Sequence, residues 1–358
     1  MNVPRGVRAG ETALLEQARG GDEAAFGELT GLYVTELRAH CYRMLGSVRD
    51  AEDALQEVLL RAWRGLPGFK GRSSVRSWLY AIATNAALDA AQHRSRRELP
   101  VDFSPAAAPG AGLDPPQTDL PWLEPFPDRW LAHNADPSPE TRYEQRESVE
   151  LAFIAALQHL PPLQRAALLL REVAGFSAAD IARQLGTSQA AVNSALQRAR
   201  ATARDRLPAR SQQETLRLLG DQHTRALAGR YADALERGDA DTLVSMLTEA
   251  ATWSMPPLTA WYRGHQAIRE FLVRYPLTAR WRHRPTWASG QLAVGCYMRD
   301  QATGRYLPAV IDVLTLDGAK IAAVTAFLTP QALPPHQSGP WASGTEMFSL
   351  FGLPAGLP

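Results

Sequence analysis

The segment 176–200, FSAADIARQLGTSQAAVNSALQRAR, holds side chains that could read base pairs. Hydroxyl, amide and guanidinium groups recur along its second half, and such groups pair with base edges in the major groove of DNA. The arginines that follow could hold phosphates, which position a protein on DNA without selecting a sequence. The residues that we expect to meet a DNA duplex are Ser188, Gln189, Asn193, Ser194, Gln197, Arg198, Arg200 and Arg204.

Two short helices around a tight turn would position these groups. Ser177 can cap the first helix, and Gly186 suits the left-handed position after its end. Thr187 or Ser188 can then cap the second helix. The residues expected to face inward are Ile181, Ala182 and Leu185 from the first helix and Val192, Leu196 and Ala199 from the second. A plain helical hairpin is the alternative, but the pattern favours a helix-turn-helix, whose second helix enters the major groove.

Positive charge is concentrated around this segment. The chain has 358 residues and a net charge of +1, whereas residues 161–210 hold eight Arg against three acids, a local balance of 8 − 3 = +5. No Lys or Arg stands between Thr187 and Gln197, so the predicted second helix carries little charge of its own. Non-specific affinity for DNA comes mostly from such charges, so the pattern raises the question of what else holds the DNA.

Residues 50–97 carry a second patterned surface. Apolar residues recur there at i, i+4, i+7 and i+11, as on the buried face of a helix, and they are Ala51, Leu55, Val58 and Ala62. The opposite face would carry Asp50, Asp53, Gln56 and Glu57. Acids on a helix often serve solubility alone, and a surface for a basic partner is the other interpretation.

The chain from Asp50 to Trp63 and from Phe69 to Arg94 resembles regions 2.2 to 2.4 of sigma-70 family initiation factors, especially the extracytoplasmic function (ECF) group. Residues 161–206 resemble region 4 of that family. The resemblance implies that the acidic face binds core RNA polymerase, that region 2 captures the melted −10 element and that the helix-turn-helix binds the −35 duplex. The residues implied for the −10 element are Phe69, Lys70, Arg72, Ser73, Ser74, Asn85, Asp89 and Arg94. Polymerase would then supply most of the attraction to DNA, which makes a lightly charged recognition helix sufficient.

A third block begins near residue 218 and turns to strands after about 250. Residues 292–298 and 310–316 alternate as in antiparallel strands, and Asp317-Gly318 supplies a turn into IAAVTAFL. Before them, 211–239 is expected to form one surface-polar helix closed by Gly238. The block resembles SnoaL-like domains, in which a curved sheet wraps around helices. Some relatives with that fold use a His–Asp pair for proton transfer, and the residues here that could line a cavity are Trp253, Trp261, Tyr262, His265 and Asp312.

The expected organisation is therefore two all-α sigma domains, a region 2 helical bundle and a region 4 helix-turn-helix, followed by an α+β SnoaL-like cone. The bounds that we predict are 11–98 for region 2, 99–141 for a Pro-rich linker, 142–210 for region 4, 218–330 for the SnoaL-like domain and 331–358 for a flexible tail. The linker is unusual because Trp122, Phe126 and Trp130 recur every four residues. These aromatic residues could dock on polymerase, dock on the chain's own third domain or have no role.

Composition limits the other possibilities. No apolar run approaches the roughly 18 residues of a membrane span, and the two cysteines, Cys41 and Cys296, lie far apart, so we expect a cytoplasmic protein without a disulfide or metal framework. No cofactor or catalytic residue is expected. We predict a factor that binds core RNA polymerase and directs it to −35/−10 promoters, with a third domain that regulates it and could hold a small-molecule ligand. The alternatives are a SnoaL-like enzyme or sensor fused to DNA-binding helices, and a stand-alone helix-turn-helix repressor.

Overall fold

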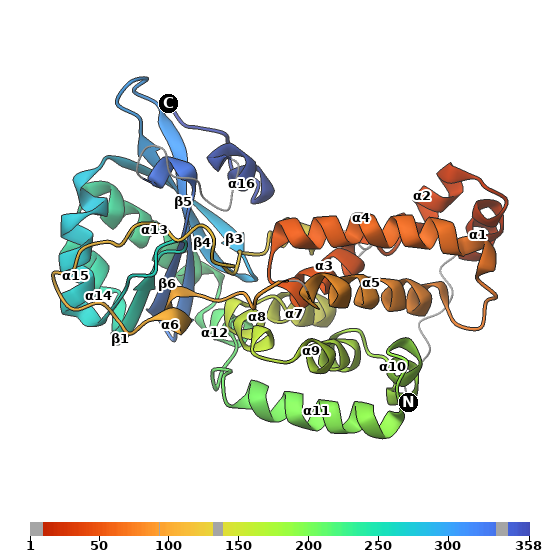
Figure 1. Ribbon diagram of the computed structural model, residues 1–358. Helices are drawn as coiled ribbons and strands as arrows, with labels where there is room; N and C mark the ends of the chain where they lie inside the picture. The colour runs from red at the N-terminus through yellow and green to blue at the C-terminus, as the bar shows by residue number, and fades with distance from the viewer. Residues whose placement is uncertain (1–9, 93, 132–138, 334–342) are drawn as a thin grey trace. The chain divides into compact units, whose positions relative to one another are not determined.

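The computed structural model describes residues 10–92, 94–131, 139–333 and 343–358 (Figure 1). The chain divides into two compact units. The first contains Met1–Arg94, Trp130–Ser138 and His159–Asp205, and the second contains Ser95–Arg129, Pro139–Gln158 and Arg206–Pro358. The units therefore do not coincide with consecutive blocks of sequence, because the linker and the start of the predicted region 4 are divided between them.

The first part of unit 1 is a bundle of helices. It consists of α1 (Glu11–Arg19), α2 (Glu23–Gly31), α3 (Val34–Leu45), α4 (Val48–Gly65) and α5 (Val75–Gln92). Helices α3, α4 and α5 pack against one another. Ser47 caps α4 by accepting a hydrogen bond from the Asp50 N–H at 3.1 Å. The apolar stripe predicted for α4 is buried, since Ala51, Leu55, Val58 and Ala62 are at most 4% exposed.

The second part of unit 1 contains α9 (Pro162–Leu168), a π-helical continuation over Leu169–Val173, α10 (Ala178–Gln184) and α11 (Gln189–Arg204). Ser177 caps α10 and Ser188, rather than Thr187, caps α11. Gly186 takes the left-handed conformation between them, with a φ of 62°. Helix α9 packs against both α5 and α11 (Figure 1).

Unit 2 is built on one six-stranded sheet in the order β2-β1-β6-β5-β4-β3. The strands are β1 (Leu247–Ser254), β2 (Trp261–Arg263), β3 (Trp281–Ala288), β4 (Gln291–Arg299), β5 (Tyr306–Asp317) and β6 (Lys320–Leu328). The prediction of an antiparallel sheet holds for all neighbours except β1 and β6, which run parallel. One face of the sheet packs on α13 (Asp221–Arg237), α14 (Ala240–Ser245) and α15 (Gly264–Arg274), and the apolar core lies between them.

The single helix expected over 211–239 is wrong. The chain forms α12 (Gln212–Leu219) and then α13, and the break lies at Gly220, whose φ of 79° and ψ of 157° lie outside the helical region. The end of α13 is as predicted, because Gly238 adopts the left-handed conformation at its C-terminus.

The flexible tail expected over 331–358 is also wrong for its final part. Residues 344–350 form α16 (Gly344–Leu350), and Met347 and Phe348 are fully buried. The Phe348 ring meets that of Tyr297 on β4 at 4.9 Å, and the Tyr297 hydroxyl donates to the Pro354 carbonyl at 3.0 Å. This part of the chain covers the face of the sheet that points away from α13, because burial of its aromatic side chains stabilises the contact. Residues 334–342 lie outside the described part.

The linker contributes α6 (Pro100–Phe103), and after it come α7 (Pro139–Glu147) and α8 (Leu151–Gln158). Most of residues 99–129 lie extended along unit 2. The Ala107 N–H donates to the Trp261 carbonyl at 2.7 Å, and the Gln117 N–H donates to the Pro257 carbonyl at 2.9 Å. These backbone hydrogen bonds hold the Pro-rich segment against the loop that precedes β2 and against β2 itself.

Candidate functional site

The acidic face predicted on α4 is only partly exposed. Asp53 and Gln56 are exposed, and Glu57 is half-buried beside Arg61, whose Nε donates to it at 2.7 Å. Asp50 is different, because it is buried at 7% exposure and forms an ion pair with Arg94. The sequence-based placement of Asp50 on an open surface is therefore wrong, since its partner stands far along the chain. Arg94 itself keeps 45% of its side chain exposed.

Arg61 connects α4, which carries the predicted polymerase surface, with α5, the predicted −10 helix. Its guanidinium bonds Glu57 on α4 and also donates to Asp89 on α5 at 2.9 Å. Hydrogen bonds from Arg61 to Glu57, and then to Asp89, raise the pKa of Arg61. We did not predict this residue, although its i,i+4 spacing from Glu57 is a signal visible in the sequence.

The loop predicted to capture a base lies between η1 (Leu66–Gly68) and α5. Phe69 is buried at 8% exposure, and its ring lies 4.8 Å from that of Trp78, which packs on the cluster around Leu66. The other predicted loop residues are exposed, namely Lys70, Arg72, Ser73 and Ser74, and so is Asn85 on α5. Phe69 and Trp78 therefore support the loop, and the cations and hydroxyls around them are the groups that face solvent.

The predicted recognition surface lies on α11. Val192, Leu196 and Ala199 are buried at 4% exposure or less, as expected. All eight predicted contact residues, Ser188, Gln189, Asn193, Ser194, Gln197, Arg198, Arg200 and Arg204, are exposed. Within the described residues, Arg200 is the one among them that forms an ion pair, and its Nε donates to Glu172 at 3.1 Å. The amides thus face outward from the first turns of α11 and the arginines from its later turns.

A contact between α5 and the segment before α10 was not predicted. Arg76 on α5 donates to the Ala174 carbonyl at 3.1 Å, and its guanidinium carbon lies 5.1 Å from the centre of the Phe176 ring. Glu36 on α3 pairs with the same guanidinium at 2.9 Å. The Tyr80 ring meets that of Phe176 at 5.2 Å. These partners are half-buried or buried, so the contact is part of the packed interior of unit 1.

Arg165 on α9 strengthens the same packing. It is 5% exposed, and its guanidinium bonds the carbonyl oxygens of Met44 on α3 and of Leu160. Gln184 on α10 donates to the Ser77 hydroxyl on α5 at 3.1 Å. Unit 1 therefore holds the predicted −10 helix and the helix-turn-helix in direct contact.

The aromatic residues of the linker are separated by the structure. Trp122 and Phe126 are buried in unit 2 at 2% and 0% exposure, whereas Trp130 belongs to unit 1 and lies half-buried under Arg38. Phe126 exchanges two hydrogen bonds with Ser289, which lies in the turn between β3 and β4. The Phe126 N–H donates to the Ser289 hydroxyl at 2.9 Å, and the Ser289 N–H donates to the Phe126 carbonyl at 2.7 Å.

The same β3–β4 turn also holds the residues that lead into α8. The Leu151 N–H donates to the Gln291 side chain at 2.9 Å, and the Gly290 N–H donates to Asp128 of the linker at 2.8 Å. Glu150 accepts hydrogen bonds from the backbone N–H groups of Gln212 and Gln213 at 3.0 and 2.8 Å, at the start of α12. Burial raises the pKa of Glu150 to about 7, and these two N–H donors lower it. Linker and α8 are thus joined to the third block within one packed unit.

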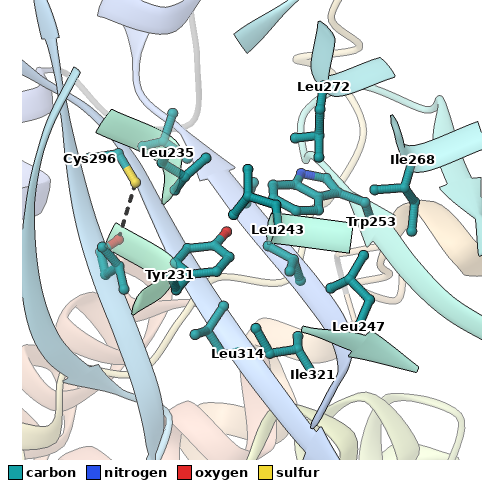
Figure 2. Close-up of a cluster of buried hydrophobic side chains, with 14 of the residues drawn as sticks. Tyr231, Leu235, Leu243, Leu247, Trp253, Ile268, Leu272, Cys296, Leu314 and Ile321 are labelled. Carbon is teal, nitrogen blue, oxygen red and sulfur yellow. Dashed lines mark hydrogen bonds between the residues drawn. The ribbon is translucent and has the colours of Figure 1, made fainter. Parts of the chain in front are cut away.

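The candidate cavity residues of the third block do not form one acid–base site. Asp312 lies in the core, where it accepts hydrogen bonds from the Tyr231 hydroxyl at 2.8 Å and the Cys296 thiol at 3.4 Å. Burial raises the pKa of Asp312 to about 6. Figure 2 shows Tyr231 and Cys296 among the apolar side chains of this core, which include Trp253. The inward orientation predicted for Asp312 is therefore seen.

The remaining candidates are engaged elsewhere. His265 lies in the first turn of α15, and its Nε2 is 3.3 Å from the Leu247 carbonyl oxygen. The Trp261 indole donates to the Ser104 carbonyl at 2.8 Å, and the Tyr262 hydroxyl donates to the Ala111 carbonyl at 3.3 Å. Both acceptors belong to the linker, so these two aromatic residues hold the linker. Over the part of the chain that the structure covers, no helix is both long enough and apolar enough to cross a membrane.

Comparison with known families matches three parts of the chain. Residues 29–97 match Sigma-70 region 2, residues 150–202 match Sigma-70 region 4, and residues 228–324 match the SnoaL-like domain. The first two matches contain α4, α5 and α11, which carry the surfaces described above, and the third contains Asp312.

Individual relatives agree with these matches. The ECF RNA polymerase sigma factor SigG of Mycobacterium tuberculosis is 43% identical over 342 residues, which cover 93% of this chain and 85% of that protein. The RNA polymerase sigma-H factor of Pseudomonas aeruginosa is 31% identical over 52% of this chain and 88% of its own length. The crystal structure of the M. tuberculosis ECF sigma factor SigJ shares the fold, with a TM-score of 0.54 and 22% identity over 86% of this chain and 97% of that chain. The chain therefore belongs to the ECF sigma factors, the transcription initiation factors of RNA polymerase, and carries a SnoaL-like domain after its sigma regions.

Proposed function

We propose that the chain binds core RNA polymerase through the exposed part of α4 and directs it to promoters with −35 and −10 elements. Asp53, Gln56 and Glu57 form the polymerase surface in this proposal. The loop 69–74, with Asn85 and Asp89, takes the melted −10 strand, and the exposed residues of α11 take the −35 duplex. The observation that supports the proposal best is the outward orientation of every amide and arginine predicted on α11, above a buried apolar face.

Run-off transcription with core polymerase on a library of genomic fragments tests this proposal. Transcripts that begin at a shared −35/−10 pattern, and only when the factor is added, are expected. A stand-alone repressor would instead bind duplex promoter DNA tightly without polymerase, which a gel shift detects. Strong duplex binding combined with no factor-dependent transcript would contradict the proposal.

The third domain, in our proposal, regulates the factor by restraining its sigma regions. The support comes from unit 2, where the linker and the start of region 4 are both held by the β3–β4 turn through Phe126, Asp128 and Leu151. A sigma factor must set its two DNA-binding regions at the spacing of the −35 and −10 elements. A domain that holds the connection between these regions limits the spacings available, and its tethering keeps its local concentration on the order of millimolar.

The packing inside unit 1 supports a restrained state as well. Helix α5 and the segment before α10 share the buried Arg76–Phe176 contact, so region 2 and most of region 4 form one packed body. Two elements that are separated along a promoter require these regions to move apart. We propose that the structure corresponds to this closed state and that polymerase and promoter DNA select an open one.

Catalysis by the third domain is the alternative that we disfavour. Asp312 is committed to Tyr231 and Cys296 inside the core, and His265, the predicted partner, binds a backbone carbonyl on another element. A general base must reach its substrate proton within hydrogen-bond distance. Asp312 and His265 are bonded to different elements and do not face a shared site for a substrate. Incubation of the full chain with lactone and polyketide-like substrates tests the point, and turnover that is lost in Asp312→Asn would favour the alternative. A small-molecule ligand that only binds would shift the thermal unfolding temperature without turnover.

A further inference from the structure

The edge strand β3 and the residue just before it carry a row of arginines on one face. Arg280, Arg282 and Arg284 are all exposed, whereas Trp281 and His283 between them turn toward the core side. Alternation along a strand places every second residue on one face, at steps of about 6.6–6.8 Å. The strand β3 is the last in the strand order of the sheet, and its neighbour within the sheet is β4.

A fourth arginine extends the row onto the neighbouring strand. Arg299 at the end of β4 lies directly beside Arg280, and its N–H donates to the Arg280 carbonyl at 2.9 Å. Tyr306 stands opposite Arg299 on β5, and its ring centre lies 5.5 Å from the guanidinium carbon of Arg282. We define Arg280, Arg282, Arg284 and Arg299 as the edge-strand patch.

Acids near this patch leave most of its charge uncompensated. Glu236 approaches Arg282 at 3.5 Å but also accepts the His283 N–H at 2.8 Å. Asp300 follows Arg299, but its carboxylate is used within the β4–β5 turn by the N–H and hydroxyl groups of Thr303. In the part of the chain that the structure describes, the other three arginines of the patch form no ion pair. The segment 351–357, which lies beside the patch on the sheet, has no charged side chain.

One pair in this patch destabilises the fold. Like charges placed side by side on neighbouring strands are destabilising, and Arg280 and Arg299 are such a pair. An acid at either position would stabilise the sheet, so packing does not account for the patch. An external anion would relieve the repulsion, and guanidinium groups match phosphate geometry through paired hydrogen bonds.

We propose that the edge-strand patch binds the phosphate backbone of duplex DNA outside the −10 and −35 contacts. A row of arginines at fixed steps on a strand can meet successive phosphates of one backbone, and phosphate contacts carry no sequence information. The partner is DNA because the chain already acts on promoter DNA, and the contact goes beyond the region 2 and region 4 surfaces proposed above. The third domain would thereby add sequence-independent affinity that the lightly charged recognition helix lacks.

The test uses the full chain and a duplex of about 30 base pairs without a promoter sequence, long enough for several phosphate contacts. Fluorescence anisotropy is measured between roughly 50 and 200 mM salt. The variant is R280Q/R282Q/R284Q, and the matched control is R217Q/R225Q/R230Q, which removes three exposed arginines from α12 and α13. The slope of log affinity against log salt should become shallower by about 0.9 for each lost phosphate contact in the patch variant and stay unchanged in the control.

A second variant, R299Q, distinguishes a lost DNA contact from misfolding of the protein. R299Q alone removes the like-charge pair, so its thermal unfolding temperature should not fall, while its salt slope should become shallower by about 0.9. Equal slopes and affinities for the patch variant, R299Q, the control and the unmodified chain would overturn the proposal. Loss of affinity for single-stranded RNA or for core polymerase, with duplex binding intact, would also overturn it. The −35/−10 sequence preference should not change in either variant, which separates this proposal from the promoter contacts of α5 and α11.

Discussion

Arg76 of α5 lies 5.1 Å from the centre of the Phe176 ring and donates a hydrogen bond to the Ala174 carbonyl, two residues before that ring. The contact joins the helix predicted to bind the −10 element to the segment that precedes the helix-turn-helix. A half-buried cation–π pair is more favourable than an exposed one, because water competes less for the guanidinium. This contact therefore holds regions 2 and 4 together in the closed state that we propose.

Phe176→Leu should weaken the closed state while keeping the position apolar. Loss of the contacts of Arg76 and Tyr80 with the ring is expected to lower the unfolding free energy by about 1 kcal/mol. Run-off transcription at limiting factor concentration should rise several-fold, since opening costs less. The matched control is Phe26→Leu, which removes a ring pair with Trp63 elsewhere in unit 1. Equal transcript yields from both variants and the unmodified chain would show that the contact does not restrain the factor.

Asp53→Lys should weaken binding to core polymerase and leave the fold intact, because the side chain is exposed on α4. Charge reversal at a rim position mostly slows association, and this effect becomes larger as the salt concentration falls. Competition against another sigma factor for a limiting amount of core polymerase measures the effect. Glu28→Lys reverses an exposed acid on α2 and serves as the control. If the two variants compete equally well, the polymerase surface lies elsewhere.

Asn193→Ala and Gln197→Ala should change which −35 sequences are used. Each lost bidentate contact to a base is worth about 1–3 kcal/mol of discrimination. Arg204→Gln should instead weaken all promoters alike and reduce the salt dependence, because a phosphate contact carries no sequence information. Transcription from a panel of −35 variants distinguishes the two outcomes, and a uniform loss in all three proteins would mean that α11 has been misassigned.

Asp312 should make the stability of the chain depend on pH. Burial raises its pKa from 3.8 to about 6, so the folded state binds the proton more tightly than the unfolded state does. The contribution of Asp312 to the unfolding free energy is therefore fully present below pH 3.8 and is lost as the pH rises through 6, by a total on the order of 3 kcal/mol. Asp312→Asn cannot titrate and can still accept the Tyr231 hydroxyl.

The difference in unfolding free energy between this variant and the unmodified chain isolates Asp312 from the other carboxyl groups. Glu150 and Asp128 also have raised pKa values, about 7 and about 6, and they contribute equally to both proteins. The difference should shift in favour of the variant between about pH 4 and pH 7. A difference that stays constant over that range would contradict the raised pKa of Asp312.

The parts of the fold that follow a local period could be predicted from the sequence. Val192, Leu196 and Ala199 on α11 and the inward position of Asp312 on β5 depend only on the geometry of one helix or strand. The two caps around Gly186 are local as well. The resemblance to sigma factors supplied the functional assignment of these surfaces, which spacing alone does not provide.

Features that depend on distant partners could not be predicted. Asp50 has the same pattern as Asp53, but it is buried because Arg94 pairs with it. The contact of Arg76 with Phe176 joins segments whose local patterns give no sign of each other. The C-terminal segment is visibly apolar around Phe348. Nothing in its own sequence indicates that it packs on a face of the sheet. Tertiary packing decided each of these cases.

The measurement that tests restraint by the third domain most directly is transcription by Phe126→Ala. Phe126 is fully buried, so loss of its ring should weaken the docking of the linker by about 3–5 kcal/mol, while the backbone hydrogen bonds of residue 126 with Ser289 remain possible. A chain ending near Arg210 is a less clean comparison, because it also removes the partners of Glu150. Val101→Ala changes an exposed position of the same linker and is the control.

Both variants are compared with the unmodified chain in run-off transcription with core polymerase at limiting factor concentration, on several promoters that share the −35/−10 pattern. The restraint predicts higher transcript yields from Phe126→Ala at every promoter and unchanged yields from Val101→Ala. Yields from Phe126→Ala that equal or fall below those of the unmodified chain, with core-polymerase binding retained, would contradict it.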